Sequence, residues 1–128
     1  MNLKSYLGQL QKSIETRKEI NVQYFRAIET TPNQVGYLEG RLYFWDGSFL
    51  EFYEALSVRG VTLVRTDYAY HYQTADNDLI FRYDNAPHHP EISTHPHHKH
   101  TATGLEATKP PHLNDILGEI DALLYPTE

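Results

Sequence analysis

The chain has 128 residues, a formal net charge of −6 and no cysteine. This length predicts a single domain over residues 1–128, and the lack of cysteine excludes disulfides, thiolate metal sites and a cysteine nucleophile. The acidic balance argues against nonspecific coating of DNA. No apolar run approaches the roughly 18 residues that span a bilayer, so we expect a soluble, cytoplasmic protein without membrane contact.

The first half of the chain predicts a helix followed by strands. Residues 2–18 carry apolar side chains at helical spacing, which predicts a helix with one buried face. From Ile20 the apolar period changes to two, and this alternation predicts a sheet over residues 20–85. Asp46-Gly47 lies between two runs of aromatic and aliphatic residues, which predicts a hairpin with a two-residue type I′ turn.

The last third of the chain changes character. Residues 86–111 hold five prolines and show no periodicity, which predicts a long loop. Residues 112–124 show a clean amphipathic stripe and predict a second helix. Together these elements predict an α+β fold, with a single antiparallel meander sheet of about five strands and the N-terminal and C-terminal helices packed on one face.

The last predicted hairpin brings polar side chains together. A two-residue turn at Asp76-Asn77 would pair Tyr72 with Phe81, and the same register puts His71 opposite Arg82. Asp84 would share that polar face, whereas a slip of two residues would pair it directly with His71. The group favours either an acid/base site with an anion clamp or an exposed polar face with weak ion pairs.

Six histidines lie within thirteen residues of the predicted loop; they are His88, His89, His95, His97, His98 and His100. Imidazole titrates near neutral pH, so these side chains suit proton transfer or phosphate contact, structural hydrogen bonding, or metal ligation. Their spacing does not favour a metal specifically. The five prolines, with Ile92 as an apolar anchor, predict that the loop folds back over the sheet.

Two segments of the chain resemble the TumE-type toxin family. They are Arg82-Tyr83-Asp84-Asn85-Ala86-Pro87-His88-His89-Pro90 and His97-His98-Lys99-His100, within a similarity that covers roughly residues 36–124. The resemblance implies the toxin half of a type II toxin–antitoxin pair, with a small antitoxin protein as its partner. RNA is the target expected by analogy with other small toxins.

Three functions follow from these residues. The first is a metal-independent endoribonuclease without cofactor, in which His71 and one of His97, His98 or His100 form the acid/base pair. Its other candidates are Asp84 to orient an imidazole, Arg82 and Lys99 to hold the phosphate, Tyr70 and Tyr83 to stack a base, and His88 and His89 to contact substrate. The second is a non-catalytic protein-binding module, and the third a metal-binding regulator. The sequence also leaves open whether the chain forms a homodimer.

Overall fold

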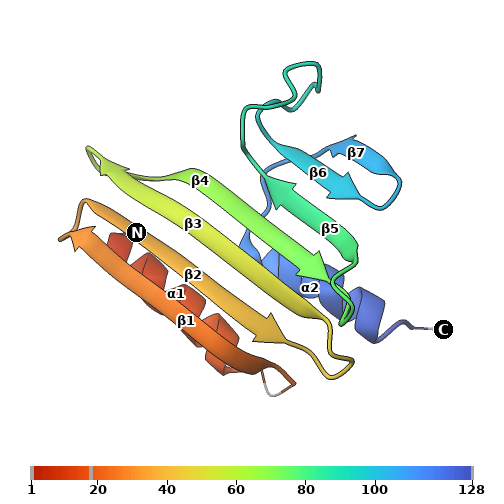
Figure 1. The fold of residues 1–128 in the computed structure, drawn as a ribbon. Coiled ribbons are helices and arrows are strands. Elements are labelled where there is room, and N and C mark those ends of the chain that lie inside the picture. Colours follow the sequence, from red (N-terminus) through yellow and green to blue (C-terminus); the bar gives the residue numbers. More distant parts are fainter. Residues whose placement is uncertain (1, 18, 128) are drawn as a thin grey trace.

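Seven strands form one antiparallel sheet whose spatial order follows the sequence (Figure 1). The computed structural model describes residues 2–17 and 19–127. The elements are α1 Leu3–Glu15, β1 Asn21–Thr31, β2 Val35–Tyr43, β3 Phe49–Arg59, β4 Thr62–Gln73, β5 Leu79–Asp84, β6 His98–Thr101, β7 Gly104–Ala107 and α2 Leu113–Leu124. The predicted α+β class is confirmed, but the sheet has seven strands rather than five.

The two additional strands lie inside the segment predicted to be a loop. His98 pairs with Asp84, so β6 extends the sheet beyond β5, and β7 returns beside it. Residues 98–107 of the segment therefore join the edge of the sheet and do not fold over its face. The hydrophobic pattern could not reveal β6, because its residues His98 to Thr101 alternate between faces without an apolar side chain among them.

Both helices cover the same face of the sheet (Figure 1). Helix α1 contributes Leu3, Leu7, Leu10 and Ile14 to the core, and α2 contributes Leu113, Ile116, Leu117 and Ile120. Asn2 caps α1 by accepting a hydrogen bond from the backbone N–H of Ser5 at 2.8 Å. The helix ends at Glu15, before the predicted end at residue 18, which lies outside the described residues. Within those residues, no helix has the length and apolarity needed to cross a membrane.

The hairpin predicted at Asp46-Gly47 is present, but its turn differs from the type I′ form. Gly47 has a φ of +83°, whereas Asp46 does not adopt positive φ. The backbone N–H of Gly47 donates to the carbonyl of Phe44, and that of Phe44 donates to Ser48, so the connection spans residues 44–48. Asp46 instead stabilises the loop by accepting hydrogen bonds from the N–H and hydroxyl of Ser48.

A glycine in β2 lets an aromatic ring lie across the sheet. Gly40 pairs with Phe52 on β3, and a methyl group at Gly40 would lie 2.6 Å from Cζ of that ring. Phe52 is only 4% exposed and also contacts Phe25 on β1. The space that a side chain at Gly40 would take is therefore occupied by the phenyl ring of Phe52.

We expect Gly40→Ala to lower the free energy of unfolding by about 1–3 kcal/mol, because Phe52 must leave its packed position. Gly8→Ala is the matched control: an added Cβ at this position in α1 meets nothing within 4 Å. In a helix interior that change should raise stability by about 0.5–1 kcal/mol. Urea denaturation measures both variants. A Gly40→Ala protein as stable as the unmodified chain would contradict this account of the packing.

Candidate functional site

Three neighbouring strands place a row of basic side chains on the face that the helices leave open. His71 on β4 pairs with Arg82 on β5, and Arg82 pairs with His100 on β6. The pairing of Tyr72 with Phe81 agrees with the register predicted from Asp76-Asn77. A bulge near Gln73 and a positive φ at Asn77 complete the turn. Arg82 therefore lies between two imidazoles, with one paired strand on each side.

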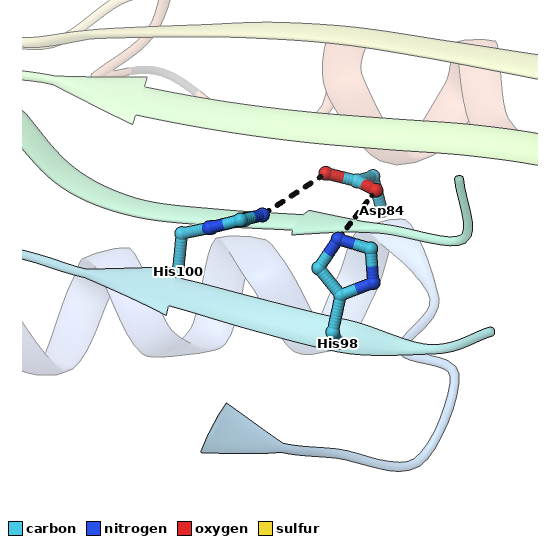
Figure 2. Close-up of side chains that lie close together, drawn as sticks. All are labelled: Asp84, His98 and His100. Carbon is cyan, nitrogen blue, oxygen red and sulfur yellow. Dashed lines mark ion pairs between the residues drawn. The ribbon is translucent and has the colours of Figure 1, made fainter. Parts of the chain in front are cut away.

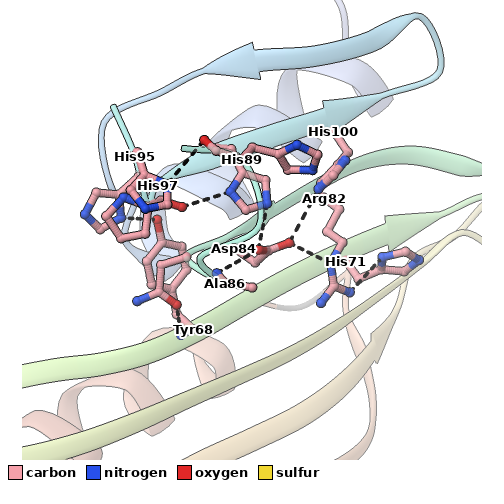
Figure 3. Close-up of polar contacts among 12 residues, drawn as sticks. Tyr68, His71, Arg82, Asp84, Ala86, His89, His95, His97 and His100 are labelled. Carbon is pink, nitrogen blue, oxygen red and sulfur yellow. Dashed lines mark hydrogen bonds and ion pairs between the residues drawn. The ribbon is translucent and has the colours of Figure 1, made fainter. Parts of the chain in front are cut away.

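The carboxylate of Asp84 holds this part of the site together (Figures 2 and 3). Its Oδ2 accepts from Nε of Arg82 at 2.9 Å, and its Oδ1 accepts from the backbone N–H of Ala86 at 3.0 Å. Nε2 of His98 lies 2.8 Å from Oδ1, and Nε2 of His100 lies 3.7 Å from Oδ2. The Asp84 residue is 5% exposed, so these contacts replace water around a buried charge.

His98 is buried between a carbonyl and a carboxylate. Its Nδ1 lies 2.8 Å from the carbonyl oxygen of Pro96, which can only accept, so Nδ1 carries a proton. Its Nε2 then either donates a second proton to Asp84 or presents a lone pair beside that carboxylate. The residue is only 2% exposed. His98 therefore orients Asp84 and is poorly placed to touch a substrate.

His71 and His100 are the imidazoles of the row that reach the surface in part. Burial first, and then the charge of Arg82, lowers the pKa of His71 from its usual value of 6.5. Burial and neighbouring His98 lower the pKa of His100 in the same direction, against the pull of Asp84. Nη1 of Arg82 lies 3.2 Å from Nδ1 of His71, which accepts this hydrogen bond when the ring is neutral.

Two hollows flank Arg82 on the open face. One, of about 450 Å³, is lined by Arg82, Asp84 and the four histidines His88, His89, His98 and His100. The other, of about 400 Å³, is lined by His71, Arg82 and Glu51 among others. His88 and His89, which were predicted to contact substrate, thus line the same hollow as Arg82. A ligand bound across Arg82 would reach both hollows.

Other predicted candidates lie on the helix-covered face. Tyr70 is 0% exposed and donates to Glu54, whereas Tyr83 donates to Glu119 on α2. Lys99 pairs with the same Glu119 at 2.9 Å and lies over the rings of Phe81 and Tyr83. The structure does not bring these three side chains to Arg82, because neighbouring residues of a strand face opposite sides of the sheet.

His97 is also separated from the row. Its ring stacks on that of Tyr68, and its Nδ1 lies 2.8 Å from the Tyr68 hydroxyl (Figure 3). Glu51, by contrast, lies opposite His71 on β3 and was not among the predicted site residues. The turn at Arg59-Gly60, which joins β3 to β4, could not have revealed it, because the bulge at Thr66 shifts the register by one residue before His71. The carbonyl of Pro96 could not have been found, because no side-chain pattern reports a carbonyl direction.

One carboxylate and two imidazoles of this site also suit a divalent metal. The ligand atoms of Asp84, His98 and His100 all lie within 4.8 Å of one another. The hydrogen bond from Nδ1 of His98 to Pro96 is the kind of outer contact that fixes a metal-binding imidazole. The guanidinium of Arg82 already compensates the Asp84 carboxylate, however, and a cation would have to share that oxygen. The donor set therefore fits Zn²⁺ in residue type, with Arg82 as its competitor.

Comparison with known proteins places the whole arrangement in a family. A family model described as Toxin TumE matches residues 10–124. No curated protein and no solved structure matches the chain. The match includes the end of α1 from Leu10, all of α2 and every strand of the sheet, together with the row of His71, Arg82 and His100. The chain belongs to the TumE toxin family.

Proposed function

We propose that the chain acts as a toxin by cleaving RNA without a metal, through acid/base chemistry at His71 and His100. The observation that carries this proposal is the placement of Arg82 directly between two partly exposed imidazoles on the open face. Cleavage by the neighbouring 2′-hydroxyl needs a base, an acid and a cation on the phosphate. The row supplies these three groups.

The chemistry assigns one step to each group. His100 takes the proton from the 2′-hydroxyl as its oxygen attacks phosphorus, and Asp84 at 3.7 Å stabilises the imidazolium that forms. The bond from phosphorus to the 5′-oxygen breaks, and protonated His71 gives its proton to that leaving oxygen. In this protonated form, Nδ1 of His71 no longer accepts the hydrogen bond from Nη1 of Arg82. The products are a 2′,3′-cyclic phosphate and a 5′-hydroxyl. Proton uptake by one histidine and release by the other balance over the step.

The Nη2 atom of Arg82 is available to bind the phosphate. Its Nε binds Asp84 and its Nη1 contacts His71. Within residues 2–17 and 19–127, its Nη2 has no hydrogen-bond partner. A guanidinium that the buried Asp84 carboxylate already holds loses little further freedom on binding an anion. Asp84 and His98 are positioning residues in this account, since both are buried.

The family also suggests an antitoxin partner. We propose that a small antitoxin protein neutralises this chain by covering the open face at the row. That face is free of helices (Figure 1), and it carries the groups that the proposed chemistry uses. Binding at this place would remove RNA from the row without unfolding the chain.

A second candidate is metal binding at Asp84, His98 and His100, which the convergence of their ligand atoms favours. Bound metal would occupy the base of the proposed reaction, so the two functions exclude each other at His100. Metal content of the purified, untagged protein separates them. A stoichiometric transition metal would favour the second candidate over the first.

Two adjacent residues give the sharpest test of the proposed row. We expect His100→Ala to lower the rate of cleavage of a generic RNA by about 10²–10⁴-fold, the usual contribution of a general acid or base. Lys99→Ala is the matched control, because Lys99 points to the opposite face and binds Glu119. It should keep the rate and lose at most about 1 kcal/mol of stability. Equal losses of rate in both variants would refute the assignment of the row.

The pH dependence of cleavage follows from the lowered pKa values of both histidines. The productive form has one imidazole neutral and the other protonated, so its population peaks between the two pKa values. Since both pKa values lie below 6.5, the rate should peak below pH 6.5 and fall as the pH rises through 7. The measurement is the cleavage rate at limiting RNA between about pH 4.5 and 8. A maximum above pH 7 would exclude these two residues as the pair.

A further inference from the structure

A β-bulge turns Arg65 to the face opposite the row. Ala55 on β3 pairs with Asp67 and Leu56 pairs with Arg65, so Thr66 is the additional residue of β4. Without this extra residue, alternation along β4 would place Arg65 on the open side with His71. The bulge instead brings Arg65 beside Tyr68 and Tyr70, on the helix-covered side. Bulges of this kind redirect a side chain at a defined place.

The side chain of Asn85 binds the backbone of the bulged residue and of the strand just after it. Its Oδ1 accepts from the N–H of Tyr68 at 3.0 Å, and its Nδ2 donates to the carbonyl of Thr66 at 2.9 Å. Asn85 directly follows Asp84, the residue that holds the row. Consecutive residues thus support two different features, the row on the open face and Arg65 on the covered face.

Arg65 is held without a direct carboxylate partner. Its Nη1 donates to the Tyr70 hydroxyl at 2.7 Å and to the carbonyl of Pro111 at 2.6 Å, and its Cζ lies 4.3 Å from the centre of the Tyr68 ring. Among the ion pairs of the described residues, none involves Arg65; Glu54 is separated from it by the Tyr70 hydroxyl. A partly buried guanidinium without an ion pair favours an anion nearby.

His97 adds an N–H donor beside this guanidinium. Burial raises the pKa of Tyr68 to about 12, so its hydroxyl keeps its proton at neutral pH. When that hydroxyl donates to Nδ1 of His97, which lies 2.8 Å away, the neutral imidazole carries its proton on Nε2. The pKa of His97 is itself lowered, by burial and then by Arg65. The neutral ring therefore still offers a donor.

These groups line one small pocket. It has a volume of about 250 Å³ and is lined by Tyr6, Leu56, Leu63, Arg65, Tyr68, His97, Pro110 and His112. Drug-sized ligands fill pockets of roughly 300–1,000 Å³, so this one suits a single small group. Arg65, His97 and His112 bring side-chain nitrogen atoms to it, and no carboxylate is among its lining residues.

We propose that this pocket binds a phosphate group of the RNA strand other than the scissile phosphate on Arg82, which lies on the opposite face of the sheet. The proposal rests on the RNA cleavage proposed above for the row. His97 and His98 connect the two places, because they are consecutive and contact Tyr68 on one face and Asp84 on the other. The strand would then be held on both sides of the point where β5 ends and β6 begins.

The test uses the full chain and a 2′-O-methyl RNA oligonucleotide, which the proposed chemistry cannot cleave. Fluorescence anisotropy should show that Arg65→Gln binds this probe about tenfold more weakly, with a salt slope smaller by about one. With cleavable RNA, the same variant should raise KM about tenfold and keep kcat within about twofold, because Arg65 acts on binding only. Unchanged affinity and salt slope would overturn the proposal.

Two further measurements keep the result interpretable. His112→Ala removes a second lining side chain and should weaken probe binding. Because His112 is also the N-cap of α2 and takes part in its capping box, the melting temperature is measured alongside, and binding is compared at a temperature where the variant is folded. Inorganic phosphate should shift the NMR signals of the His97 ring in the unmodified chain and not in Arg65→Gln. Phosphate and probe binding without any cleavage would leave the pocket standing and remove the proposed nuclease. If the chain cleaves RNA and neither variant changes binding or cleavage, the pocket proposal is refuted and the proposed nuclease stands.

Discussion

The carboxylate of Asp84 is the contact on which the arrangement of the open face depends. It receives Arg82 from its own strand, a backbone N–H from the following turn, and the imidazole of His98 from the next strand. Burying one charge beside these donors is favourable only while all of them remain in place. The pairing of β5 with β6 and the position of Arg82 are therefore stabilised by the same side chain.

The two faces of the sheet divide the work of folding and chemistry. The covered face buries aromatic rings against both helices. Its polar groups bind one another: Tyr6 and Tyr70 donate to Glu54, and Tyr83 and Lys99 donate to Glu119. The open face needs no apolar cover and carries the basic row. Because residues alternate along each strand, a change of register by one residue would exchange these two surfaces. The aromatic packing therefore also fixes which polar groups face outward.

Much of this fold is predictable from the sequence, since apolar periodicity reports both helices and the first five strands. The register at Asp76-Asn77 follows from face alternation, and it correctly places His71 opposite Arg82. The same alternation shows why Tyr70 and Tyr83 could not join that group: each adjoins one of those residues and faces the other way.

Three features lay beyond the sequence pattern. Strand β6 is polar throughout, so its pairing depends on Asp84 and carries no hydrophobic signal. The role of His98 depends on the direction of the Pro96 carbonyl, which is set by the turn before it. Arg65 reaches the covered face through a bulge, and a bulge inverts the parity on which strand predictions rely. Each depends on backbone geometry that side-chain periodicity does not encode.

The central claim is that the row cleaves RNA through the neighbouring 2′-hydroxyl, and a single-atom change in the substrate tests it most directly. The measurement compares a DNA oligonucleotide that contains one ribonucleotide with the same strand made entirely of DNA, both incubated with the purified chain in the presence of a chelator. The account predicts cleavage only after the ribonucleotide, with a 2′,3′-cyclic phosphate on one product and a 5′-hydroxyl on the other. Cleavage of the all-DNA strand, or products with 5′-phosphate ends, would contradict it.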